Sequence, residues 1–417
     1  MSTPAATDRH GSVLGLLEQA NDVFADTVSL RRELHRWPEI GNDLPSTREQ
    51  VLAALEGLPL EITLHQSTSG IVATLVGDKP GDTVLLRGDM DALPMPEDTD
   101  LDFSSANKNR MHACGHDMHT SMLVASAKIL SARKANIAGR VMFMFQPGEE
   151  GYGGAVFMLN EGMLDVAPLP NGKASPITGA FAMHMTPNIP TGMVGIRPGP
   201  TMASSDTLTI IIAGRGGHAS APHQALDPVP VACEIVQALQ TLVTRRLDVF
   251  DPGVITVTNI HAGTAYNVIP ETVEIKGTMR AISERTREQI HEGIQRVANG
   301  IATAHEMSAT VLLERGYPVT INDDNFALFA EDVGRAVMGE KNVIRMPHPV
   351  MGAEDFSYVL HKLPGAMMFI GATPEGVNPN TAAPNHSNRA IFNEEAMRKG
   401  SAMYAAVALR HLNSRLT

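Results

Sequence analysis

Two hydrophobic patterns alternate along most of the chain. Continuous apolar runs at 83–87, 141–145 and 179–183 are typical of buried strands, and the segments between them carry apolar residues at helical spacing. The first such segment, residues 13–36, stops at Trp37-Pro38 because proline cannot continue a helix. This alternation predicts an α/β fold: a mixed, mostly parallel sheet with helices on both faces.

The middle of the chain follows a different order. Strands at 205–213, 253–260, 272–281 and 309–314 are interleaved with helices at 227–245 and 283–305, where Asp227 and Ser283 stand as N-caps. The order β-α-β-β-α-β is that of a ferredoxin-like α+β domain. We therefore expect a discontinuous larger domain of residues 1–199 and 318–417, interrupted by a smaller domain of residues 200–317. In the returning part we expect helices near 325–337 and 353–361, a strand at 366–370 and a final helix from Asn393.

Composition narrows the class of protein. The 417 residues carry a net charge of -12, which argues against nucleic acid or an anionic membrane as a partner. No apolar run approaches the roughly 18 residues that a membrane helix needs. Cys114 and Cys233 are too few for a disulfide framework, and residues 1–11 are polar, without the apolar core of a secretory signal. We expect a cytoplasmic protein.

Residues 111–119 are dense in metal-capable side chains. They include Cys114, Asp117 and three histidines around one glycine. Thiolate and imidazole are ligands suited to zinc-like ions, and burying so many polar groups is costly unless something coordinates them. The alternative is a polar loop that enters a helix, with Asp117 as a local cap.

Polar groups also recur where predicted strands end. Asp89 and Asp91 follow the first of the three strands, Glu149-Glu150 follow the second, and His184 ends the third. Ligands of open α/β sheets bind at the carboxyl ends of the strands, so this recurrence favours a site. Taken alone, Glu149-Glu150 is more often a solvated turn and His184 a core histidine. His386 is not reached by this argument and is by itself a loop histidine.

Local spacing suggests how these side chains point. In extended chain, Cys114 and His116 would face the same side, whereas Glu149 and Glu150 would face opposite sides. One glutamate would then bind a metal while its neighbour faces the substrate as a general base. The alternative mechanism uses Cys114 as a nucleophile with His116 as its base. It is disfavoured because this spacing makes contact between the two side chains poor.

Ten stretches together resemble the metal-dependent aminoacylase and amidohydrolase family of metallopeptidases, which includes hippurate hydrolases and plant auxin-conjugate hydrolases. They occur in the same order over nearly the whole chain, and the cysteine-histidine and Gly-Glu-Glu stretches are the most specific. The matching residues are 30–35, 88–94, 112–117, 146–151, 183–184, 217–223, 267–270, 277–280, 352–356 and 386–387.

The resemblance implies a site with two divalent metal ions per subunit, which could be zinc, manganese, cobalt or nickel. It assigns Glu149 as the general acid/base. His218 would reach the active site of a partner subunit, and Asn267 and Arg280 would bind the amino-acid part of the substrate. From the residues alone, Arg280 could equally form a surface ion pair and Asn267 could cap a turn. The implied metal ligands are Cys114, His116, Glu150, His184 and His386.

The same resemblance leaves three acidic residues without a firm role. Asp91 matches a position that orients a metal-binding histidine in related peptidases, but Asp89 stands where that histidine would be. Glu354 could line the pocket or simply sit at the start of a helix.

The expected function is hydrolysis of small-molecule N-acyl amino acids, carrying an acetyl, benzoyl or aryl-acyl group, to a carboxylic acid and a free amino acid. The alternatives are a dipeptidase or carboxypeptidase on short peptides, and a catalytically inactive binding relative. Glu149 beside a full ligand set argues against the last. We expect a homodimer formed through the inserted dimerisation/lid domain, whose edge strands need covering.

Overall fold

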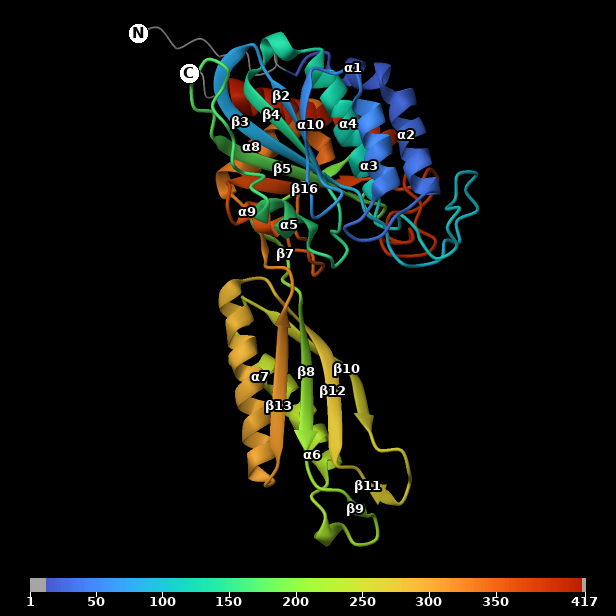
Figure 1. The fold of residues 1–417 in the computed structure, drawn as a ribbon, viewed down its shortest axis with the longest axis vertical. Helices are drawn as coiled ribbons and strands as arrows, with labels where there is room; N and C mark the ends of the chain where they lie inside the picture. The colour runs from blue at the N-terminus through green and yellow to red at the C-terminus, as the bar shows by residue number, and fades with distance from the viewer. Residues whose placement is uncertain (1–12, 415–417) are drawn as a thin grey trace. The chain divides into compact units, whose positions relative to one another are not determined.

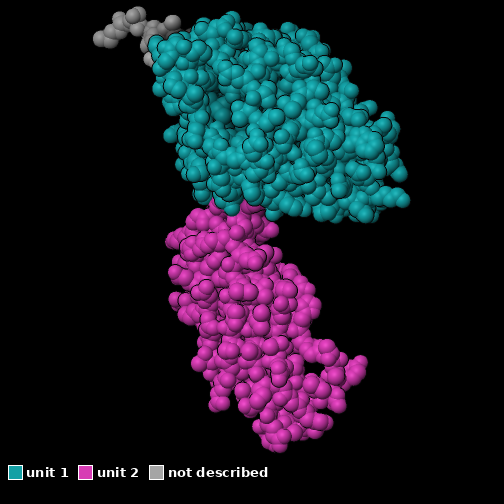
Figure 2. Space-filling view, in the orientation of Figure 1, with its two compact units in different colours: residues 1–199, 321–347, 358–417 teal, residues 200–320, 348–357 magenta. Residues whose placement is uncertain are grey.

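The computed structural model describes residues 13–414, and the polar segment 1–11 lies outside the described residues. The chain divides into two compact units (Figure 2). Unit 1 comprises residues 1–199, 321–347 and 358–417, and unit 2 comprises 200–320 and 348–357. Residues 318–320 and 348–357 therefore group with unit 2, although the sequence pattern assigned both stretches to the larger domain.

Unit 1 is built on an eight-stranded sheet (Figure 1). In spatial order its strands are β1 (Leu60–Leu64), β2 (Ile71–Val76), β4 (Ala138–Gln146), β3 (Lys79–Asp89), β5 (Ile177–Thr186), β16 (Gly365–Gly371), β6 (Val194–Ile196) and β15 (Val343–Arg345). The central neighbours β4, β3, β5 and β16 run parallel, while β1, β2 and β6 introduce antiparallel pairs. The mixed, mostly parallel sheet is thus confirmed.

Helices α4 and α10 both contact β3 and β5 and pack against each other, which buries the middle of the sheet. The rings of Phe181 in β5 and Tyr404 in α10 pack against each other with centroids 5.7 Å apart, and Phe143 is fully buried in the same core. The helices of unit 1 are α1 (Leu16–Asp22), α2 (Phe24–Arg36), α3 (Pro45–Leu55), α4 (His116–Ser131), α5 (Gly154–Asn160), α8 (Asp324–Met338), α9 (Ser357–Leu360) and α10 (Glu395–Ser414), where α9 begins at the last residue of unit 2.

Two predicted helices differ in detail. The helix predicted over 13–36 is two helices, because Val23 leaves the helical conformation at φ -97° and ψ 2°. The helix predicted near 353–361 is only the single turn α9, because Glu354 and Asp355 precede it in non-helical backbone.

Unit 2 has the predicted β-α-β-β-α-β order. Its sheet runs β10 (Gly253–Ala262), β12 (Thr272–Ala281), β8 (Asp206–Ala213) and β13 (Ser308–Arg315), all antiparallel. Helices α6 (Pro228–Arg246) and α7 (Glu284–Ala304) pack on this sheet, and Asp227 and Ser283 cap them as expected. Two short strand pairs remain. Strand β9 (Gly217–His218) pairs with β11 (Val268–Ile269), and β7 (Gly199–Met202) pairs with β14 (Thr320–Asn322). The chain passes from one unit to the other within β7 and within β14.

Across residues 13–414, none of the helices combines the length and the apolar character needed to cross a membrane.

Candidate metal centre

The candidate site forms where three parallel strands end side by side. Strands β4, β3 and β5 are neighbours in the sheet and end at Gln146, Asp89 and Thr186. Glu149-Glu150 and Asp91 follow the first two strands, and His184 lies close to the carboxyl end of β5. The sequence argument from strand ends therefore identified neighbouring groups, since the carboxyl ends of parallel strands meet at one sheet edge.

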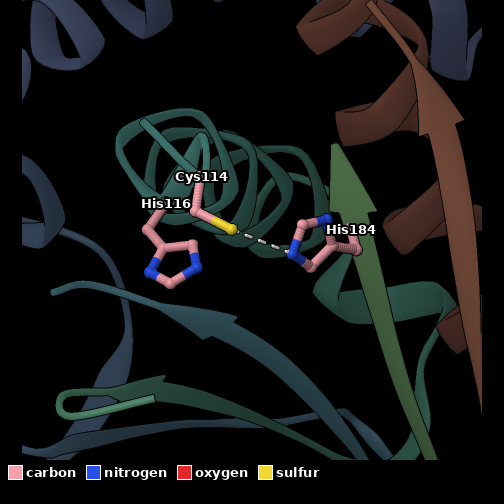
Figure 3. Close-up of side chains that lie close together, drawn as sticks. All are labelled: Cys114, His116 and His184. Atoms are coloured by element: carbon pink, nitrogen blue, oxygen red, sulfur yellow. Dashed lines mark hydrogen bonds between the residues drawn. The ribbon is translucent and has the colours of Figure 1, made fainter. Parts of the chain in front are cut away.

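Cys114 and His116 enter the site from the start of α4. Gly115 between them adopts a left-handed conformation at φ 88°, and His116 is the first residue of the helix. The expectation of extended chain at this point was wrong, because the backbone turns at Gly115. Both side chains nevertheless converge with His184, which comes from β5 (Figure 3).

Cys114 belongs to two groups of potential ligands. Its Sγ atom lies 3.4 Å from Nε2 of His184 and 3.3 Å from Nε2 of His386. One group is Cys114, His116 and His184, and the other is Cys114, Glu150 and His386, each with its ligand atoms within 4.8 Å of one another. A cysteine sulfur shared by two such groups is placed to contact two metal ions.

His386 reaches the site from a distant loop that backbone contacts hold in place. It has φ 68°, and its N–H donates to Ala113 O at 2.9 Å. The preceding Asn385 donates from Nδ2 to Cys114 O at 3.1 Å and to Met185 O at 2.9 Å. Sequence reasoning missed Asn385. The only signal was its position beside His386.

Glu149 and Glu150 lie in a turn rather than a strand. The Asp91 carboxylate accepts hydrogen bonds from the amide of Glu149 at 2.9 Å and from that of Glu150 at 3.0 Å. One oxygen of each glutamate then lies 3.9 Å from His116 Nε2. The expectation that the two carboxylates face opposite sides was wrong, because this turn directs both to the same histidine.

Two histidines direct their Nε2 atoms into the site because their Nδ1 atoms bond to backbone carbonyls. His116 Nδ1 donates to Asp91 O at 2.8 Å, and His184 Nδ1 donates to Met185 O at 2.8 Å, since a carbonyl can only accept. The Nε2 atom of His116 is buried and makes no hydrogen bond. A buried imidazole nitrogen without a hydrogen-bond partner, beside a thiol and carboxylates, is chemistry that fits a zinc-like ion.

The charges of the site are strongly coupled. Burial, and then the Glu150 carboxylate, raise the pKa of the Cys114 thiol. Hydrogen bonds to Cys114 and Glu150 raise the pKa of His386 to about 10. Burial holds the pKa of His184 well below its usual range. A thiol with a raised pKa is a poor nucleophile, which disfavours the alternative mechanism that uses Cys114 as a nucleophile.

The other predicted substrate residues lie in unit 2. His218 in β9 pairs with Val268 and is exposed, and Asn267 O accepts the Ala219 N–H at 3.0 Å. Arg280 lies in β12 beside Ala281, at the opposite end of the unit 2 sheet. His218 and Asn267 are therefore brought together, and Arg280 is not with them.

Asp89 and Glu354, to which the sequence assigned no firm role, have different surroundings. Asp89 is buried between Arg87 and two histidines, with Oδ2 3.5 Å from His116 Nε2 and Oδ1 2.6 Å from His119 Nδ1. Glu354 is a buried residue of unit 2 whose Oε1 accepts the Phe356 N–H at 2.9 Å. Sequence reasoning gave His119 no role, although it lies in the dense stretch 111–119.

This fold and ligand set define a class: metal-binding hydrolases with an α/β domain interrupted by a ferredoxin-like insert. The model of peptidase family M20/M25/M40 matches residues 85–410, so the chain belongs to that family. The predicted family membership is thereby confirmed.

Three similar proteins extend this match. IAA-amino acid hydrolase ILR1-like 4 of Arabidopsis thaliana is 36% identical over 95% of this chain and 88% of its own length. Thermostable carboxypeptidase 1 of Saccharolobus solfataricus is 35% identical over 93% of this chain and 95% of its own. The crystal structure of Bacillus subtilis YXEP, described as a dinuclear metal binding peptidase, has a TM-score of 0.80 and 31% identity, covering 94% of this chain and 99% of its own.

Proposed function

We propose that this chain is a metal-dependent amidohydrolase that cleaves small-molecule N-acyl amino acids to a carboxylic acid and a free amino acid. The observation that carries the proposal is the shared position of Cys114 between two ligand groups, with the Glu149 carboxylate close to one of them. A thiol, imidazoles and a carboxylate converge there on a small volume, as a pair of divalent ions requires.

The proposed ligands divide into the two groups that share Cys114. His116 and His184 would hold one ion, and Glu150 and His386 the other. Zinc, manganese, cobalt and nickel all suit these donors, and the description of the Bacillus structure as dinuclear supports two ions. When bound, the metal pair would polarise the scissile carbonyl and lower the pKa of water.

Glu149 is the proposed general acid/base. Its backbone is fixed by Asp91, and its side chain is buried beside His116. In this position the carboxylate would take a proton from the attacking water and return it to the leaving amine. Asp91 would act as a positioning residue, because it holds the amides of both Glu149 and Glu150.

The substrate class rests on the relatives. The plant relative is named as an IAA-amino acid hydrolase. We propose Asn267 and Arg280 as contacts of the amino-acid part, since a guanidinium can grip a free carboxylate with two hydrogen bonds. The second candidate is a carboxypeptidase or dipeptidase, which the name of the archaeal relative favours.

We further propose a homodimer in which His218 acts in the partner's active site. Its support is placement: His218 is exposed at the end of the unit 2 sheet away from Arg280. Both cysteines are free thiols, which supports the proposed cytoplasmic location.

The test is a substrate panel with metal control. The protein is stripped with a chelator, restored with manganese, zinc, cobalt or nickel, and assayed on N-acetyl, N-benzoyl and indoleacetyl amino acids beside dipeptides. Metal-restored cleavage of the acyl amino acids supports the proposal. Cleavage of dipeptides alone would instead support the second candidate function, a dipeptidase or carboxypeptidase.

A further inference from the structure

Strand β5 loses its β3 neighbour just before it reaches the candidate metal centre, while its other neighbour, β16, stays paired with it through Thr186. Its pairing with β3 ends at Ala182, opposite Arg87. The next amides on that edge meet side chains instead of a strand. The Met183 N–H donates to the Tyr404 hydroxyl at 3.0 Å, and the Met185 N–H donates to His119 Nε2 at 2.7 Å. On the edge that faced β3, side chains therefore take over from the strand in holding the last residues of β5.

The hydrogen bond from Met185 determines the tautomer of His119. An amide N–H can only donate, so His119 Nε2 is unprotonated and Nδ1 carries the hydrogen. That hydrogen is donated to Asp89 Oδ1 at 2.6 Å. Asp89 is itself held by Arg87, whose guanidinium lies 2.5 Å from Oδ2. The buried acid thus orients a buried imidazole whose two ring nitrogens are both occupied.

The carbonyl of the same residue determines the tautomer of a candidate ligand. Met185 O accepts from His184 Nδ1 at 2.8 Å and from Asn385 Nδ2 at 2.9 Å. With Nδ1 protonated, His184 presents the Nε2 lone pair, 3.4 Å from Cys114 Sγ. Asn385 also bonds Cys114 O and directly precedes His386. Residue 185 therefore connects groups that belong to both ligand sets.

We propose that His119 and Asn385 are positioning residues of the metal centre, which act through the backbone of Met185 to orient His184 and His386. Asp89 supports them by fixing the proton of His119. His119 is not itself a ligand, because neither of its ring nitrogens is free. The inference rests on the proposed metal centre and adds to it the residues that pre-organise its histidines. Such supporting hydrogen bonds fix the ring orientation of a ligand and raise its affinity for metal.

The test measures binding of cobalt(II) alone to the full-length, chelator-stripped protein, followed by visible absorption. His119→Ala removes the acceptor of the Met185 N–H, and Asn385→Ala removes one donor to its carbonyl. Both are expected to weaken cobalt binding by about 10–100-fold and to alter the absorption spectrum. His119→Gln, whose side-chain oxygen can still accept from Met185, is expected to recover most of the affinity.

Tyr404→Phe is the matched control, because it removes the equivalent side-chain acceptor at Met183 on the same strand edge. It is expected to lower the melting temperature while leaving cobalt affinity unchanged. Equal cobalt binding by wild type, His119→Ala and Asn385→Ala would overturn the inference, and so would an equal loss in Tyr404→Phe. Should His119→Ala fail to fold, Asn385→Ala and His119→Gln decide. Absence of cobalt binding by the wild type would instead overturn the metal centre itself.

Discussion

Cys114 Sγ lies 3.3 Å from Nε2 of His386, although 272 positions separate the two residues along the chain. The contact joins the start of α4 to a loop near the C-terminal end of the sequence. It places the thiol in a second group of ligand atoms besides the one that contains His184. A single side chain is thus shared by the whole candidate centre.

Replacing this shared thiol should remove metal from both positions. Cys114→Ala is expected to lose both ions and nearly all activity, because each ion loses a ligand. Cys114→Ser, which keeps a weaker oxygen donor, is expected to retain part of the metal. Metal content per subunit, measured after dialysis, checks this. Loss of a single ion in Cys114→Ala would show that the thiol is not shared.

Removing the charge of Glu149 should separate chemistry from metal binding. Glu149→Gln is expected to lower kcat by roughly 10²–10⁴-fold, since it abolishes proton transfer, with metal content unchanged. Glu150→Gln is the matched comparison at the adjacent position, and it should instead lower metal content. Normal activity in Glu149→Gln would contradict the assigned mechanism.

His218 offers a test of the proposed dimer. A His218→Ala protein and a Glu149→Gln protein should each be nearly inactive alone. Mixed dimers hold one active site with both native residues, so mixing should restore up to about a quarter of the wild-type activity per subunit if half of the dimers are mixed. Subunit exchange is verified with differently tagged chains. Confirmed exchange without rescue would place His218 outside the partner's site.

Asp206 should make the stability of unit 2 depend on pH in the acidic range. It accepts hydrogen bonds from Arg287 at 2.8 Å and His291 at 2.7 Å. Burial opposes its charge, but these partners outweigh burial and hold its pKa below the usual 3.8. The folded state therefore binds the proton more weakly than the unfolded state does. The stabilisation is present above about pH 4 and is lost as the pH falls through the lowered pKa.

The corresponding variant is Asp206→Asn. It is expected to lower the free energy of unfolding at neutral pH by about 1.5–3 kcal/mol, a typical contribution of a hydrogen bond to a charged group. Its melting temperature should also fall less steeply than that of the wild type between pH 5 and 3. Asp248→Asn, which removes an exposed ion pair with Arg285, is the control and should change little. Identical pH profiles for wild type and Asp206→Asn would contradict the argument.

The sequence alone was sufficient for the fold class and for part of the site. Apolar runs and helical spacing are local, so they identified the parallel strands and the β-α-β-β-α-β insert. Asp89, Glu149 and His184 could be related to one another because each lies at or just beyond a strand end, and the ends of neighbouring parallel strands meet. His386 was assigned by resemblance alone, since no local pattern marks it.

Only the tertiary structure decided how these groups face one another. The backbone turns at Gly115 in a left-handed conformation, so Cys114 and His116 do not lie in the expected extended chain. The Asp91 carboxylate accepts hydrogen bonds from the amides of Glu149 and Glu150, which places these residues in a turn. His119 and Asn385 act on Met185, which is 66 and 200 positions away from them. Spacing along a chain specifies period and direction within one element. Hydrogen bonds between distant elements depend on how those elements pack against each other, and a local sequence pattern does not specify that packing.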